Sequence, residues 1–120
     1  DLEQMCRRVL FTILIGNRDD HLRNHGFLRE GNGWRLSPAF DINPNPEKDV
    51  HVLAIDDVEP TPDSGLWRKT AEFYRVKGRA LDRIESEVRQ AVAQWREVAR
   101  AQGASRGDIN RMATVIDPQR

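Results

Sequence analysis

A regular apolar stripe in the second half of the chain constrains the fold more than any other feature. The stripe recurs at alternating intervals of three and four residues, and its members are Leu81, Ile84, Val88, Ala91, Trp95 and Val98. This spacing places the six side chains on one face of an α-helix, so it predicts a long helix over 79–101 that ends at Gly103. The architecture is therefore expected to be helical.

Three further helices are expected. The first can be capped by Asp1, ends at Gly16 and Asn17, and should be buried nearly all round. Its apolar positions at helical spacing are Leu2, Met5, Val9 and Ile13. The other two helices are a segment from Ser64 through Tyr74 and a short last helix, capped by Ser105 or Asp108, through Val115.

A short β-hairpin is expected between the first helix and the rest. The segments "HGFL" and "WRLS" flank "REGNG", a turn-forming stretch that can supply positive φ angles. Residues 37–62 then form a long irregular segment rich in Pro, Asp and Asn, of the kind that is usually functional or disordered. The fold class is thus mainly α (α+β), with residues 1–120 as one domain.

Composition excludes several classes of function. Lys plus Arg and Asp plus Glu balance at 19 each, without a basic block, which argues against a nucleic-acid or membrane surface. We find neither an apolar run long enough to span a membrane nor a signal peptide, and we expect a cytoplasmic location. The lone Cys6 is expected to be a buried structural thiol. Trp34, Trp67 and Trp95 are expected to be packing residues.

The stretch "GNRDDHLRNHGFL" (16–28) gathers two aspartates, two histidines and two asparagines directly after the apolar first helix. Asp19 and Asn24 stand five positions apart before the hairpin, and Asp41 follows it. Because a hairpin folds back on itself, these three side chains can converge. Phosphoryl transfer needs such a set, with one carboxylate at the substrate hydroxyl and an oxygen-rich pair that holds magnesium.

Two simpler interpretations stand beside this one. An Asp-Asp-His turn after a helix can be merely a solvated cap. His21 and His25 also form an H-x-x-x-H pair, which on a helix would suit zinc, although Gly16 and Asn17 indicate that the helix has already ended.

The same residues carry a family resemblance. "NRDDHLRN" is similar to the protein-kinase catalytic loop H-R-D-x-x-x-x-N, with Asn17 in place of the His. Together with "WRLSPAFDINP", it resembles the C-terminal lobe of the HipA-like serine/threonine kinases of bacterial toxin–antitoxin modules. The residues that fill that family's pattern are Gly16, Asp19, His21, Asn24, Pro38, Phe40 and Asp41.

The resemblance implies a helical C-terminal lobe of a protein-kinase-like fold, with Mg²⁺ and ATP as cofactors. It implies Asp19 as the catalytic base and Asn24 and Asp41 as the magnesium ligands, with His21 and Arg18 in supporting places. It further implies a protein substrate with a hydroxyl group and a DNA-binding antitoxin as partner.

Parts of a complete kinase are not found in this sequence. It has no Gly-rich loop, and its lysines, Lys48, Lys69 and Lys77, all follow the catalytic loop. We therefore expect the chain to be a fragment that needs an N-terminal nucleotide lobe and is inactive alone. The alternative is a non-catalytic remnant, or a partner-binding domain, of the same fold.

Overall fold

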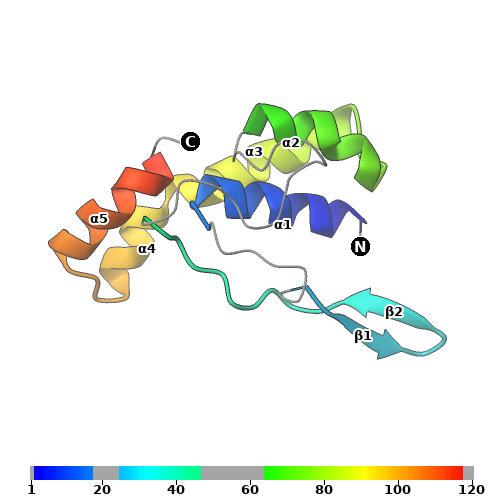
Figure 1. The fold of residues 1–120 in the computed structure, drawn as a ribbon, viewed down its shortest axis with the longest axis horizontal. Coiled ribbons are helices and arrows are strands. Elements are labelled where there is room, and N and C mark those ends of the chain that lie inside the picture. Colours follow the sequence, from blue (N-terminus) through cyan, green and yellow to red (C-terminus); the bar gives the residue numbers. More distant parts are fainter. Residues whose placement is uncertain (1, 18–24, 47–63, 118–120) are drawn as a thin grey trace.

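Helix α1 (Leu2–Leu14) is the central element of the fold (Figure 1). The computed structural model describes residues 2–17, 25–46 and 64–117. After α1 come β1 (Phe27–Glu30), β2 (Gly33–Leu36), α2 (Ser64–Thr70), the 3₁₀ helix η2 (Ala71–Tyr74), α3 (Arg79–Ala93), α4 (Trp95–Ala101) and α5 (Arg106–Ile116). Of these, α2, η2 and α3 pack against α1, whereas α4 and α5 lie at one end of the molecule (Figure 1). The described part is mainly helical with one two-stranded antiparallel sheet, as the sequence predicted.

The end of α1 is closed by a glycine cap. Gly16 has a φ of 70°, and its N–H donates to the carbonyl of Ile13 at 3.2 Å. The N–H of Asn17 donates to the carbonyl of Thr12 at 2.9 Å. This pair of hydrogen bonds is the Schellman motif, which ends a helix where glycine can take a left-handed conformation. The predicted end at Gly16 and Asn17 is confirmed, whereas Asp1 lies outside the described residues.

The core is built on the apolar face of α1, against α2 and α3. Cys6, Leu10 and Ile13 are fully buried, as is Trp67 of α2. The indole N–H of Trp67 donates to the carbonyl of Cys6 at 2.9 Å, so this one side chain both fills the core and joins the two helices. The predictions that Cys6 is a buried thiol and that Trp67 packs in the core are confirmed.

The stripe on α3 differs by one position from the prediction. Leu81, Ile84 and Val88 are buried as expected, but the next buried residue is Val92, and Ala91 is exposed. A strict alternation of three and four residues repeats every 3.5 residues, whereas a straight α-helix turns every 3.6. Over two heptads the buried face therefore moves forward along the sequence, and Val92 takes the place predicted for Ala91.

The single helix predicted over 79–101 is wrong, because it is interrupted at Gln94. This residue lies between α3 and α4, and its N–H donates to the carbonyl of Ala91 at 3.3 Å, a bond of the tighter 3₁₀ type. Beyond it, α4 has no buried residue, and Val98 is 57% exposed. The periodicity of apolar residues in the sequence continues through the break, because a change in the direction of the helix axis does not alter the spacing of these residues along the chain.

Helix α5 packs with α4 at one end of the molecule (Figure 1). Ser105 is its N-cap and accepts a hydrogen bond from the N–H of Asp108 at 3.1 Å, so the predicted cap is confirmed. Trp95 of α4 is partly buried against the core, and its indole N–H donates to Asp117 at 3.2 Å. Arg96 pairs with the same carboxylate. These contacts fix α5 relative to α4.

The hairpin of β1 and β2 extends away from the helices (Figure 1). Phe27 pairs with Leu36, and the strands are joined by Gly31 and Asn32, with a φ of 59° at Gly31. Positive φ at the first turn residue alone is the pattern of a type II′ turn. The prediction that Trp34 is a packing residue is wrong, because this side chain is 64% exposed on a hairpin that stands clear of the core.

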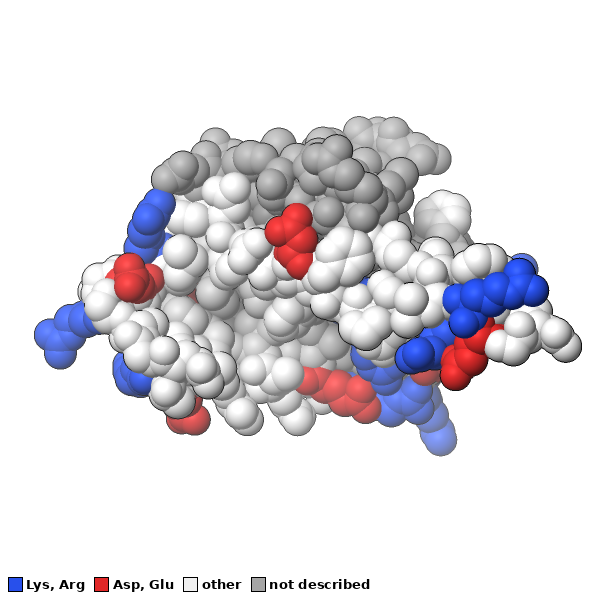
Figure 2. Space-filling model, turned by 90° about the horizontal axis from the view of Figure 1, so that it is seen from below, with Lys and Arg blue, Asp and Glu red and all other residues white. Residues whose placement is uncertain are grey.

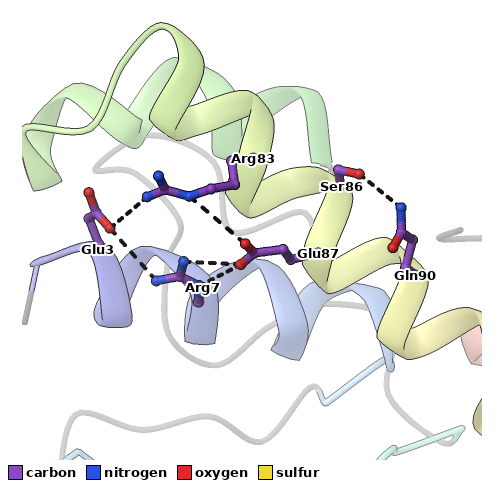
Figure 3. A network of polar contacts seen from close by, with 6 residues as sticks. All are labelled: Glu3, Arg7, Arg83, Ser86, Glu87 and Gln90. Atoms are coloured by element: carbon purple, nitrogen blue, oxygen red, sulfur yellow. Dashed lines mark hydrogen bonds and ion pairs between the residues drawn. The ribbon is translucent and has the colours of Figure 1, made fainter.

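Opposite charges connect the exposed sides of α1 and α3. Arg7 bonds to Glu87 at 3.1 Å, and Arg83 bonds to Glu3 at 3.1 Å (Figure 3). Each exposed pair is worth about 0–1 kcal/mol, so the network adds to the register of the two helices more than to their stability. On the face drawn in Figure 2, the charged residues of the described part are of both signs and lie mostly toward the two ends.

Candidate functional site

Of the predicted catalytic and metal-binding residues, Asp41 is the one that the structure describes. Asp19 and Asn24 lie outside the described residues, as do Arg18 and His21. The roles implied for these four residues stay predictions. The geometry available is that of Asp41 and of the described residues on either side of the segment 18–24.

The hairpin brings its two flanks together, as expected. The N–H of Ser37, directly after β2, donates to the carbonyl of Gly26, directly before β1, at 2.8 Å. The approach is close, since a Cβ atom built on Gly26 would lie 3.3 Å from the Ser37 hydroxyl oxygen. Gly26 is also the second described residue after the segment 18–24. The residues that follow this segment are therefore fixed against the start of the segment that carries Asp41.

We call residues 37–45 the Asp41 segment, and two hydrogen bonds attach it to α1. The Nη2 atom of Arg8 donates to the carbonyl of Ser37. The N–H of Asn45 donates to the carbonyl of Gly16 at 2.8 Å. We refer to these two bonds as the tethers. One holds the beginning of the Asp41 segment, and the other holds its end at the helix cap that precedes the segment 18–24.

Asp41 lies midway between the tethers and has an unusual backbone. Its φ is 56°, in the left-handed region, which Asp and Asn visit more readily than most residues. The side chain is exposed, and its Oδ1 atom accepts a hydrogen bond from the side-chain amide of Asn43 at 3.3 Å. The next residue, Ile42, packs against the core. The backbone conformation thus directs one side chain inward and presents the carboxylate outward.

An exposed carboxylate on a firmly held loop fits the chemistry of a magnesium ligand. Mg²⁺ prefers oxygen ligands, keeps several of its waters, and is bound by one or two carboxylates together with substrate phosphates. Asp41 offers such an oxygen, and Asn43 orients it. Asn43 was not singled out from the sequence, although its place two residues after an Asp, in "DIN", is the spacing of a local side-chain contact.

Arg8 is a second residue that the sequence prediction missed. It is only 8% exposed, and its Nε and Nη1 atoms have no hydrogen-bond partner among the described residues. Burial lowers the pKa of this guanidinium from its ordinary value. The signal in the sequence was a charged residue one position before the run "VLFTILI". The residues that follow it in α1 are buried or half-buried.

Two hollows adjoin α1. One has a volume of about 430 Å³ and lies between Arg7 and Arg8 of α1, Val88 of α3, and Pro38 and Ile42 of the Asp41 segment. The other, of about 390 Å³, is almost wholly apolar and lies between α3, α4 and α5. Among the described residues, the first hollow forms a groove along the inner side of the Asp41 segment.

The other candidate centres give no support to a different chemistry. Among residues 2–17, 25–46 and 64–117, no three His, Cys, Asp or Glu side chains are grouped so as to hold a metal ion. The zinc hypothesis depends on His21, which lies outside those ranges. Burial raises the pKa of the Cys6 thiol, so the thiolate that a nucleophile requires is disfavoured. Within the same ranges, no helix has the length and apolar character needed to cross a membrane.

The comparison with protein families gives one result. The family model for the HipA-like C-terminal domain matches residues 1–99. The match includes α1, the hairpin, the Asp41 segment and α3, and it ends before α5. No curated protein and no solved structure matches the chain significantly.

Proposed function

The chain belongs to the family of HipA-like C-terminal domains, and from this we propose that it is the catalytic C-terminal lobe of a serine/threonine protein kinase. The lobe has a protein-kinase-like fold and acts in the transfer of the γ-phosphoryl group of ATP to a protein hydroxyl. Asp19 is the catalytic base, and Asn24 and Asp41 are the magnesium ligands. Arg18 and His21 support the loop between them.

The observation that carries this proposal is the attachment of the Asp41 segment to both flanks of the segment 18–24. Gly16 precedes that segment and Gly26 follows it, and each accepts a backbone hydrogen bond from the Asp41 segment at 2.8 Å. This attachment supports the proposal, because the described residues on both sides of the segment with Asp19 and Asn24 are bonded to the segment with Asp41.

The chemistry assigned to these residues is that of general base catalysis with electrostatic stabilisation. Asp19 accepts the proton of the substrate hydroxyl. The hydroxyl oxygen then bonds to the γ-phosphorus, while the bond between that phosphorus and the ADP oxygen breaks. Asp41 and Asn24 hold Mg²⁺, which neutralises charge on the nucleotide phosphates. The fixed backbone around Asp41 supports this role, because positioning supplies much of the catalysis in phosphoryl transfer.

The groups that hold the rest of the nucleotide are assigned to a separate nucleotide-binding lobe. The exposed hairpin supports such a partner, since Phe27, Leu28 and Trp34 are 59%, 45% and 64% exposed. Large apolar side chains on an isolated two-stranded hairpin favour a covering surface. Family membership supports a toxin–antitoxin setting, in which a DNA-binding antitoxin neutralises the kinase.

Metal binding tests the proposal directly. We expect Mn²⁺, which takes the same oxygen ligands as Mg²⁺, to broaden the NMR signals of Gly26, Ile42 and Asn43, and excess Mg²⁺ to restore them. Asp41→Asn should abolish this broadening. Glu97→Gln, which removes an exposed carboxylate from α4, should leave it unchanged. If wild-type signals stay sharp, or if the Glu97 signal broadens equally, Asp41 is not a specific metal ligand, and the non-catalytic remnant becomes the favoured alternative.

Activity gives a second prediction. The 120-residue chain, incubated alone with labelled ATP and a mixture of protein substrates, should transfer no more label than its Asp19→Ala variant. The expected reason is that metal ligands and a base without nucleotide-holding groups cannot align the γ-phosphoryl group. Strong turnover that depends on Asp19 would show that a separate nucleotide-binding lobe is unnecessary.

A further inference from the structure

We infer that Arg8 is a positioning residue for Asp41: its guanidinium holds the carbonyl of Ser37 and thereby sets the path of the segment that presents the Asp41 carboxylate. This inference rests on the proposed role of Asp41 as a magnesium ligand. It concerns a residue of α1 that, among the described residues, hydrogen-bonds to the carbonyl of Ser37 and not to the Asp41 carboxylate.

The first argument is geometric. The tethers attach to α1 at Arg8 and at Gly16, positions that are about 12 Å apart along a helix with a rise of 1.5 Å per residue. The Asp41 segment joins the same two points with eight residue steps, which can span about 26 Å when extended. It is therefore about twice as long as the gap that it bridges. The excess length is taken up between the tethers, and Asp41 is the middle residue of that stretch.

The second argument concerns how the beginning of the Asp41 segment is held. The Ser37 hydroxyl donates to the carbonyl of Pro38 at 3.1 Å and so makes a local contact. The Ser37 N–H is bonded to Gly26 and so fixes the segment to the hairpin. Among the described hydrogen bonds, the one from Arg8 is what joins the start of the Asp41 segment to the core. Without this hydrogen bond, the hairpin and the start of the Asp41 segment would be less firmly fixed to α1.

The third argument is energetic. A buried guanidinium is costly when two of its nitrogen atoms have no hydrogen-bond partner among the described residues, because each lost hydrogen bond and the buried charge oppose folding. Replacing buried charge by an apolar side chain of similar size is often neutral or stabilising. Folding alone therefore does not account for an arginine here. Its hydrogen bond to the carbonyl of Ser37, at the start of the Asp41 segment, is an interaction that an apolar residue could not make.

The test combines metal binding with stability. In the Mn²⁺ titration of the 120-residue chain, Arg8→Met should raise the concentration that half-broadens the Asn43 signal by about tenfold, as for losses of groups that orient metal ligands. Its thermal unfolding midpoint should be at least that of the wild type. Arg7→Met, at the neighbouring half-buried position that bonds to Glu87 instead of Ser37, should leave the Mn²⁺ concentration unchanged. This opposite response of binding and stability would not follow from a purely structural role.

Arg8→Lys keeps a cation, but its hydrogen-bond donors are all on one nitrogen atom instead of a planar guanidinium. Its Mn²⁺ affinity should therefore lie between those of the wild type and Arg8→Met. If Arg8→Met does not fold, the Mn²⁺ affinity of Arg8→Lys is compared with that of the wild type instead. Wild-type affinity in Arg8→Met, or in Arg8→Lys in that case, would overturn the inference and leave the proposed function standing. Absence of Mn²⁺ broadening in the wild-type chain would overturn both.

Discussion

Trp67→Ala is expected to lower the free energy of unfolding by about 4 kcal/mol, a large part of the total stability of a domain of this size. The side chain is fully buried, so its removal leaves a cavity between α1 and α2. It also removes the hydrogen bond from the indole N–H to the carbonyl of Cys6. Urea unfolding followed by circular dichroism measures the change without depending on tryptophan fluorescence.

Trp34→Ala is the matched control, since it removes the same side chain from the exposed hairpin. The Arg29 guanidinium lies 5.7 Å from the centroid of the Trp34 ring, an exposed contact worth about 0.5 kcal/mol. We therefore expect a loss of about 0.5 kcal/mol. Trp67→Phe, which keeps most of the volume, should fall between the two alanine variants. Equal losses for Trp67→Ala and Trp34→Ala would mean that the core is not centred on Trp67.

Gly16→Ala is expected to cost about 3 kcal/mol, for two separate reasons. The φ of 70° is unfavourable for any residue with a Cβ atom, at about 1 kcal/mol. That Cβ atom would also lie 2.8 Å from the Cβ atom of Val115 in α5. Such an overlap must push α5 away or move the cap of α1, and overpacking of this kind costs about 1–3 kcal/mol.

Gly103 separates these two contributions. It ends α4 in the same motif, with its N–H donating to Arg100 and the N–H of Ala104 donating to Ala99, both at 3.0 Å. Its φ is 88°, and among the described residues beyond its chain neighbours no atom lies within 4 Å of a Cβ atom built there. Gly103→Ala should therefore show the conformational cost alone. In a Val115→Gly background, which removes the clashing Cβ atom, Gly16→Ala should lose most of its excess cost in unfolding free energy. An unchanged excess would contradict a clash with α5.

Local signals predicted most of the elements correctly. The glycine at 16 ended α1, the Gly31–Asn32 pair closed the hairpin, and Ser105 capped α5. Each of these depends on a few neighbouring residues, so each can be read from a short stretch of sequence. The family resemblance, based on two motifs that flank the hairpin, was confirmed by the family match over residues 1–99.

The errors arose where tertiary packing decides. The break at Gln94 preserves the spacing of apolar residues, so periodicity could not reveal it. Trp34 has the composition of a core residue, but its exposure depends on where the whole hairpin points. Arg8 was overlooked because its partner is a backbone carbonyl 29 positions away. At the candidate site, the sequence indicated that Asp41 follows the hairpin closely, whereas its left-handed backbone and its two tethers became visible only in three dimensions.

Both tethers of the Asp41 segment end on a single helix, and this has a mechanical consequence. When helices of a domain slide or rock against one another, each moves nearly as a rigid body and keeps its own length. Such breathing of α3 or α5 relative to α1 therefore leaves the span between the tethers constant. The span changes when α1 itself unwinds between Arg8 and Gly16. Fraying of that one stretch is the motion to which the Asp41 carboxylate should be most sensitive, and hydrogen exchange in its amides would report it.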